Sequence, residues 1–398
     1  MVCRTTCTEP AVNPVLRTIF AAQFGTMLRR FYFILFAALT SLGLRASDHD
    51  GAHHGAEHAA HEAPTHDAAP ADEDKAFDPN DVIMHHIKDS HGWHLFDWNN
   101  HPVSVPLPVI LWTNDGLVVF SSAEFHHDVT GTHEVVRGNQ SFVNEHEHIY
   151  YAGTHEGPLD LSITKNVMSL FVAAFIILLI FISTGRFYAR NGAVAPKGLA
   201  GFMEPLVLFV RDEIARVNLP EKHVNRFLPF LLTVFFFIWV NNMLGLIPFF
   251  PGGANLTGNI AVTMTLAVIT FLVTNFNGTK DYWLHVFWMP GVPSWLKPLI
   301  AVVEIIGLFT KPFSLMIRLF ANITAGHILV LSLVSLIFIF KTVWVSPGAI
   351  LLTLFISSLE LLVAALQAFV FTMLTAMYIG TAVTSHDHHE HEGDHAHH

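Results

Sequence analysis

Four ionisable side chains interrupt a long apolar stretch at residues 299–340: Glu304, Lys311, Arg318 and His327. A central arginine costs about 2.5 to 3.5 kcal/mol on membrane-insertion scales, so each of these residues needs a physical reason to be there. A step of seven residues advances an α-helix by two turns with a drift of only about 20°. The spacing therefore places Glu304, Lys311 and Arg318 on one face and predicts a polar stripe along an apolar helix.

The next apolar segment, residues 348–383, repeats this arrangement with Glu360 and Gln367 seven residues apart. If the two helices pack antiparallel, His327 and Glu360 lie at nearly the same depth, each about 12 residues from the outer end of its helix. By the same reasoning, Arg318 and Gln367 share a level near the middle of the membrane. The spacing thus predicts two pairs of neighbours.

The chemistry of these side chains suits the transfer and the blocking of protons. An imidazole beside a carboxylate titrates near physiological pH, so His327 and Glu360 are predicted to exchange protons on the outer side. The guanidinium of Arg318 keeps its charge, which predicts a barrier and a partner for a carboxylate on another subunit. Glu304, near the cytoplasmic end, suits proton exit, with an ion pair as an equal alternative. A purely structural hydrogen bond is the alternative for Gln367 and for the His327–Glu360 pair.

Structural roles are also open for other polar residues. Ser314 and Asn322, four residues on either side of Arg318, can bridge helices as readily as they can line a path. Lys311 precedes a proline, and snorkelling or an ion pair accounts for it. Asn241–Asn242, inside an earlier apolar segment, is predicted to join helices and not to conduct ions.

The composition requires several membrane-spanning elements to hold these residues. Hydrophobic residues make up 52% of the 398 residues and charged residues only 13%, which is too apolar for an ordinary soluble protein. We expect an all-α polytopic membrane protein, and the last two segments are long enough for tilted helices. The apolar segments are residues 165–184, 227–247, 259–276, 299–340 and 348–383.

The distribution of charge predicts the orientation of the chain. The connection at residues 185–226 is rich in arginine and lysine, whereas the loop at residues 248–258 has neither. The positive-inside rule then places the N-terminal region in the periplasm and the C-terminus in the cytoplasm of a bacterial inner membrane. Within the basic connection, Phe202, Leu206 and Phe209 recur near helical spacing, as in a helix at the membrane interface.

The N-terminal part divides by composition. Residues 1–46 are predicted to be a secretory signal peptide, with a start that is misassigned upstream of Met27. Residues 47–80 are His-rich, with no apolar period, and we expect disorder there. Residues 81–160 form a small exported region, in which Asn114-Asp115-Gly116 between apolar runs predicts a β-hairpin. A membrane domain at residues 161–383 and a His-rich tail at residues 384–398 complete the chain.

Residues 311–327, KPFSLMIRLFANITAGH, closely resemble the signature of the F-type ATP synthase a subunit. In that family an Arg-Leu-Phe-x-Asn core carries the essential arginine, which the resemblance places at Arg318. A second match, LQAFVFTMLT at residues 366–375, resembles the C-terminal helix of the family. The resemblance covers about residues 160–383, and it rests on two motifs in the expected order.

The resemblance implies roles for further residues. Asn322 and Gln367 match polar positions near the arginine and on the facing helix, and Glu304 and Ser314 match positions of the cytoplasmic half-channel. Some members carry glutamate where His327 stands and histidine where Glu360 stands, which is the same acid–base pair with its members exchanged.

The resemblance also implies partners and a mechanism. Protons enter past the histidine and glutamate, protonate a carboxylate on a rotating c-ring, and leave near Glu304 after almost a full turn. The implied partners are the c-ring, the b subunits of the peripheral stalk and membrane lipid, with no nucleic acid. No cofactor or metal is implied, and nucleotide chemistry belongs to other subunits, since no phosphate-binding loop is present.

Two other classes of function compete with this interpretation. The 27 histidines, many of them in the tail, suggest a metal-ion transporter, because imidazole clusters bind zinc or nickel. However, the predicted membrane segments contain only His327 and no ligand pair at helical spacing. Metal binding by the tails alone stays open. A structural anchor for a periplasmic complex does not account for polar residues deep in two helices.

Overall fold

The computed structural model describes residue 37 and most of residues 89–384, with gaps at 99–100, 126–132, 146, 155, 193–194, 248–251 and 341–345. Apart from Ala37, the predicted signal peptide lies outside the described residues, as do the His-rich segment and all but the first residue of the predicted tail. Those predictions are therefore untested.

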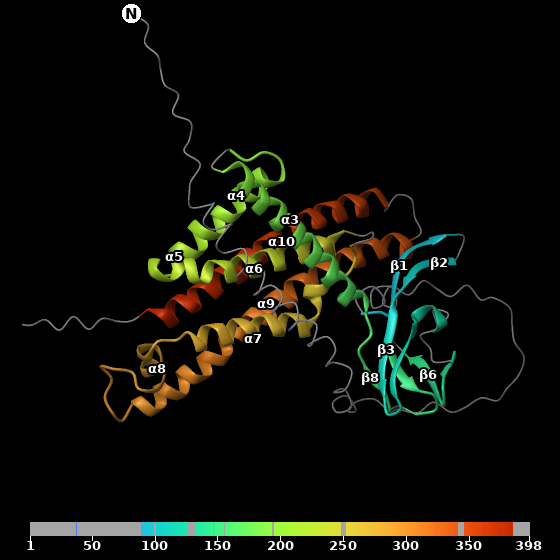
Figure 1. The fold of residues 1–398 in the computed structure, drawn as a ribbon, viewed down its shortest axis with the longest axis horizontal. Coiled ribbons are helices and arrows are strands. Elements are labelled where there is room, and N and C mark those ends of the chain that lie inside the picture. The colour runs from blue at the N-terminus through green and yellow to red at the C-terminus, as the bar shows by residue number, and fades with distance from the viewer. Residues whose placement is uncertain are drawn as a thin grey trace, which may run out of the picture.

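All five predicted apolar segments are helices, as Figure 1 shows. Four are long and apolar enough to cross a membrane on their own. The fifth, α7, is followed by the short helix α8 after a bend of 105°, and the two count as one further span when taken together. The predicted polytopic all-α fold is confirmed. The helices are α3 (Lys165–Asn191), α6 (Glu221–Leu246), α7 (Ile260–Phe276), α8 (Lys280–Phe287), α9 (Lys297–Phe340) and α10 (Ser346–Val383).

Side-chain caps set the first turns of three helices. Thr164, Asn259 and Thr279 each accept a backbone N–H from the first turns of α3, α7 and α8. Such caps satisfy N–H groups that have no partner within the helix. The cap at Thr279 explains why α8 starts anew after the bend instead of continuing α7.

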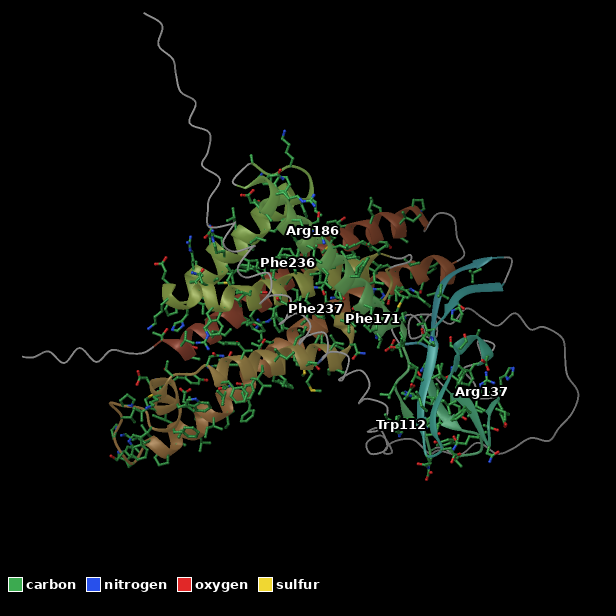
Figure 2. The ribbon with its side chains drawn as sticks, in the orientation of Figure 1. Trp112, Arg137, Phe171, Arg186, Phe236 and Phe237 are labelled. Atoms are coloured by element: carbon green, nitrogen blue, oxygen red, sulfur yellow. The ribbon has the colours of Figure 1, made fainter. Side chains whose placement is uncertain are left out.

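The core of the membrane domain is centred on α6. In α6, 83% of the most apolar stretch is buried, against 17% in α9 and in α10. The core includes Phe236 and Phe237 of α6, which lie in the middle of the bundle in Figure 2. Of the two C-terminal helices, α10 packs on α6, whereas α9 packs on α10 and α7. Both leave wide apolar faces uncovered.

The basic connection forms α4 (Leu199–Phe209), a π-helical turn η3 (Val210–Ala215) and α5 (Arg216–Asn218). The predicted helix is confirmed, and the position of its apolar stripe at the membrane interface stays a prediction. Met203 and Val207 are buried, whereas Phe202 and Phe209 are exposed. Because apolar residues occupy both sides, periodicity alone could not identify the side that packs on the bundle.

The predicted β-hairpin is confirmed in the N-terminal region. Strands β3 (Pro108–Thr113) and β4 (Gly116–Ser121) pair antiparallel, with Thr113 opposite Gly116 across the two-residue turn. Gly116 has φ +123°, a value that favours glycine. The short strand β8 (Leu159–Asp160) joins the other edge of β3.

Two further sheets lie in the described part of this region. The inner side chains of the hairpin pack against Phe125 of the turn η2 (Ser122–Phe125) and Phe142 in the neighbouring sheet. The remaining strands are β1 (Gly92–Trp98), β2 (His101–Pro106), β5 (Val135–Arg137), β6 (Gln140–Glu145) and β7 (His148–Tyr151).

Candidate functional site

The polar stripes of α9 and α10 meet at one interface. The side-chain amide of Asn322 donates a hydrogen bond to Oε1 of Gln367 over 2.9 Å. About one turn further along α9, a Cβ atom built on Gly326 would lie 3.1 Å from Oε1 of Glu360. Numbers rise along one helix as they fall along the other, so the helices are antiparallel, as the depth argument requires. These four residues, Asn322, Gly326, Glu360 and Gln367, are called the polar seam below.

Each predicted partner on α10 lies near the predicted level of α9, but its contact is with a residue up to one turn away from the predicted one. Gln367 bonds Asn322, which is one turn from Arg318, and Glu360 lies beside Gly326, the residue before His327. Direct Arg318–Gln367 and His327–Glu360 contacts stay predictions. The contacts at Asn322 and Gly326 nevertheless place the side chains of Gln367 and Glu360 against the segment of α9 between Arg318 and His327.

Burial separates the two sides of the seam. Glu360 and Gln367 are 7% and 3% exposed, whereas Arg318 is half-buried, and Ser314 and Asn322 are exposed. The side chains of α10 are thus enclosed by protein, and those of α9 border an open apolar face. A fixed cation at that border is accessible to a group carried by another protein.

A second network holds α10 in register with α6. Asn242 donates to the carbonyl of Ala364, one turn beyond Glu360, over 3.0 Å. Thr257, in the 3-10 turn η4 (Leu256–Gly258), donates in turn to Oδ1 of Asn242 over 2.7 Å. This confirms the prediction that Asn242 joins helices, while Asn241 bonds the carbonyl of Phe237 within its own helix.

A cavity lies between α7, α8, α9 and α10, away from the polar seam. Tyr282 donates to Oδ1 of Asn275 over 3.2 Å in its wall. Nζ of Lys311 lies 5.7 Å from the centre of the Tyr378 ring, which is a cation–π contact. This contact is a third structural role for Lys311, besides snorkelling and an ion pair. The cavity is lined by Thr270, Phe271, Thr274, Asn275, Tyr282, Leu308, Lys311, Pro312, Leu315 and Tyr378.

Most residues that line this cavity were not predicted from the sequence. The hydroxyls of Thr270 and Thr274 are buried and have no hydrogen-bond partner among the described residues. Neither Glu304 nor Ser314 lines the cavity, but Glu304 lies within electrostatic range of Tyr282. The two threonines are four residues apart and lie on one face of α7. Their spacing is the sequence signal for this cavity, but neither side chain is charged.

Metal coordination finds no support in the described part of the chain. No group of three or more His, Cys, Asp or Glu side chains there is placed to hold a metal ion. The His-rich segments fall outside that part.

The fold and the seam together define a polytopic membrane protein in which two long antiparallel helices carry enclosed polar groups beside a fixed cation. The chain belongs to the ATP synthase A chain family, whose model matches residues 167–380. A second model, of a domain of unknown function, matches residues 82–168, which span the β region and its junction with α3.

Curated relatives agree with the family assignment. The chain is similar to ATP synthase subunit a of Chloroherpeton thalassium, at 44% identity over 67% of this chain and 78% of the relative. ATP synthase subunit a of Chlorobium phaeobacteroides strain BS1 is 46% identical over 60% of this chain and 71% of its own length. The corresponding subunit of Anaeromyxobacter sp. strain Fw109-5 is 41% identical over 67% and 65%.

Proposed function

We propose that this chain is the proton-conducting stator subunit a of an F-type ATP synthase and supplies two half-channels to a rotating c-ring. The observation that carries the proposal is the polar seam, which sets Glu360 and Gln367 against the segment of α9 that bears Arg318 and His327. Family membership and the names of the relatives support it.

On the inlet side, a proton passes from His327 and Glu360 to a carboxylate on the ring. Glu360 is enclosed, and its Oε1 has no hydrogen-bond partner among the described residues, so it is free to accept a proton from the aqueous path. A carboxylate that accepts a proton becomes neutral and can then leave the neighbourhood of a cation at low cost. The ring carboxylate thereby enters the lipid in its protonated form.

Arg318 separates the inlet from the outlet. Its guanidinium cannot relay protons, and it attracts the ionised form of the ring carboxylate. Asn322 and Gln367 hold the adjacent turn, so that the cation stays at a fixed level. On the outlet side, Glu304 and Ser314 guide the released proton to the cytoplasm.

The uncovered faces of α9 and α10 fit the proposed partners. Both helices expose apolar side chains, such as Ile317 and Ile328 in α9, which lie three helical turns apart on a face that borders Arg318. The c-ring would cover this face, while b subunits of the peripheral stalk and lipid cover the rest. The subunit performs no nucleotide chemistry itself and lies in the bacterial inner membrane, with its β region outside and its C-terminus in the cytoplasm.

The decisive experiment replaces Arg318 with alanine in the assembled enzyme. ATP synthesis driven by a proton gradient in membrane vesicles should fall to background, because the barrier and the partner of the ring carboxylate are both lost. Leu179→Ala, at an exposed apolar position of α3, is the control and should retain activity. Retained synthesis in the Arg318 variant would exclude the proposed mechanism.

Exchange of the acid–base pair tests the inlet. His327→Glu and Glu360→His should each impair synthesis, and the double variant should recover more activity than either single variant. Absence of any recovery would argue against a working pair at this position.

A further inference from the structure

One face of the β3–β4–β8 sheet is apolar and uncovered. Trp112 is opposite Leu117 on β4 and Leu159 on β8, so these side chains share a face. Their exposed fractions are 60%, 57% and 42%. The outer apolar face, as it is called here, consists of Trp112, Leu117, Val119, Leu159 and Leu161.

The opposite face of the same sheet already fills the core of the β region. Val109, Leu111 and Phe120 are buried there. An antiparallel sheet with one packed face normally turns polar side chains to water on the other. A contiguous apolar face instead marks a surface that contacts something other than water.

The outer apolar face begins close to the membrane. Leu161 is separated from Lys165, the first residue of α3, by a stretch that spans at most about 14 Å when fully extended. From there α3 exposes Phe171, Phe175 and Leu179 at intervals of four residues, a stripe that faces lipid in a membrane-spanning helix.

Buried polar contacts fix the β region on the end of α3. Asp89 accepts hydrogen bonds from the hydroxyl of Thr164 over 2.8 Å and from the backbone of Asn166 over 3.1 Å. Nε2 of His91 lies 3.0 Å from Oδ2 of Asp160, the last residue of β8. These contacts, called the junction clamp below, prevent free rotation of the sheet about its connection to α3.

The two sides of the β region differ in polarity. Figure 2 shows Trp112 on the side of the β region nearer the helices and Arg137 on the opposite side. Arg137 pairs with Glu124 there. All five members of the outer apolar face are uncharged, and tryptophan is enriched where a bilayer meets water. The side nearer the helices is thus apolar, and the far side carries charges.

We propose that the outer apolar face rests on the surface of the lipid bilayer at the N-terminal end of α3, with Trp112 in the headgroup region. The occupant is lipid because the face is continuous along the chain with a lipid-facing helix. An added peptide strand would instead use the free edge of β4, not the face. The proposal assigns a membrane-contact role to the β region and does not depend on the proton path.

The test uses the full-length chain in phosphatidylcholine vesicles, with Cys3 and Cys7 replaced by serine. A single environment-sensitive fluorophore is attached at Leu117→Cys, and the matched control carries it at Val136→Cys. Both positions are aliphatic strand residues, 57% and 59% exposed, but Val136 belongs to β5 next to Arg137. Lipids with a nitroxide at the headgroup level and aqueous iodide serve as the two quenchers.

We expect nitroxide lipids to quench the probe at position 117 at least threefold more than the probe at position 136, and iodide to show the reverse order. Equal accessibility of both probes to iodide would overturn the proposal. Protection of position 117 from both quenchers would also overturn it, because a protein surface would then cover the face. Phe175→Cys, on the exposed side of α3, calibrates quenching by lipid.

Discussion

At the scale of single residues, the absence of a side chain at position 326 lets a carboxylate reach α9. A Cβ atom on Gly326 would lie 3.1 Å from Oε1 of Glu360 and 3.3 Å from its Cδ and Cγ. Those distances are too short for an unchanged Glu360 side chain. The glycine therefore contributes to the site although it carries no chemistry of its own.

Gly326→Ala is expected to displace the Glu360 side chain and to slow proton transfer. An off-rotamer side chain costs about 1 kcal/mol, which corresponds to a rate lower by about fivefold. ATP-driven proton pumping in inverted vesicles measures the effect. Gly307→Ala, in the same helix, is the control and should pump normally, because an added Cβ atom there would meet no neighbouring group within 4 Å. Equal pumping by both variants would show that Glu360 is not confined by α9.

The hydrogen bond between Asn322 and Gln367 can be tested as a pair. Asn322→Ala and Gln367→Ala should each destabilise the subunit by about 1 kcal/mol, and the double variant by less than the sum. Thermal unfolding in detergent measures the three differences. Strict additivity would mean that the two amides stabilise the helices independently.

The pKa of His91 makes the junction clamp sensitive to pH. Burial disfavours the charged imidazolium, but hydrogen bonds and charges from Asp160 and Glu147 outweigh burial and raise the pKa to about 9. Asp89 and the first residue of α3, Lys165, are the other charged groups nearby. Burial alone would raise the pKa of Asp160. The hydrogen bond and the charge of His91 outweigh burial, so that the pKa of Asp160 is lowered. Asp160 thus stays ionised throughout this range.

The stabilisation from protonated His91 is fully present below about pH 6.5, the pKa in the unfolded chain, and is lost as the pH rises through about 9. The shift corresponds to about 3 kcal/mol. Hydrogen exchange of β3 and β8 amides between pH 6 and pH 10, corrected for intrinsic rates, measures it. His91→Gln should remove most of this dependence of stability on pH. A flat profile in the wild-type protein would contradict the predicted role of His91.

At the scale of elements, α10 approaches α5 so closely that a side chain has no room between them. A Cβ atom on Gly380 would lie 1.9 Å from the backbone oxygen of Asn218. Gly380→Ala must therefore separate the two helices, because a backbone atom cannot rotate away. We expect a loss of stability of about 1–3 kcal/mol, seen as a lower melting temperature in detergent. Gly348→Ala, in open space on the same helix, should melt like the wild type.

The sequence predicted elements well where one local signal dominates. Long apolar runs identified the helices, a turn motif identified the β3–β4 hairpin, and steps of seven residues placed Glu360 and Gln367 on the face that meets α9. Pairings across long separations, such as His91 with Asp160, leave no such signal. Where both sides of an element are apolar, as in α4 and β3, alternation could not identify the packed side.

At the scale of the whole molecule, the contrast between α6 and the two C-terminal helices indicates where a partner is needed. Only 17% of the most apolar stretch of α9 is buried, and Ile317, beside Arg318, is exposed. Under the proposed function this face contacts the ring. Ile317→Cys should therefore form a cross-link to cysteines introduced in the ring helices under oxidation, whereas Phe175→Cys on α3 should not. Cross-links of equal yield would argue against a ring at this face.

The junction clamp has a mechanical consequence. A helix joined to its flanks by flexible linkers can slide along the bilayer normal when the thickness of the hydrocarbon layer changes. A folded region that is fixed to the end of α3 resists such movement, because movement of α3 would push the region into the bilayer or pull it off the surface. Thinner or thicker membranes must then be matched by tilt of α3 and local deformation of lipid. If the outer apolar face rests on the bilayer as proposed, the clamp thereby sets the depth of α3.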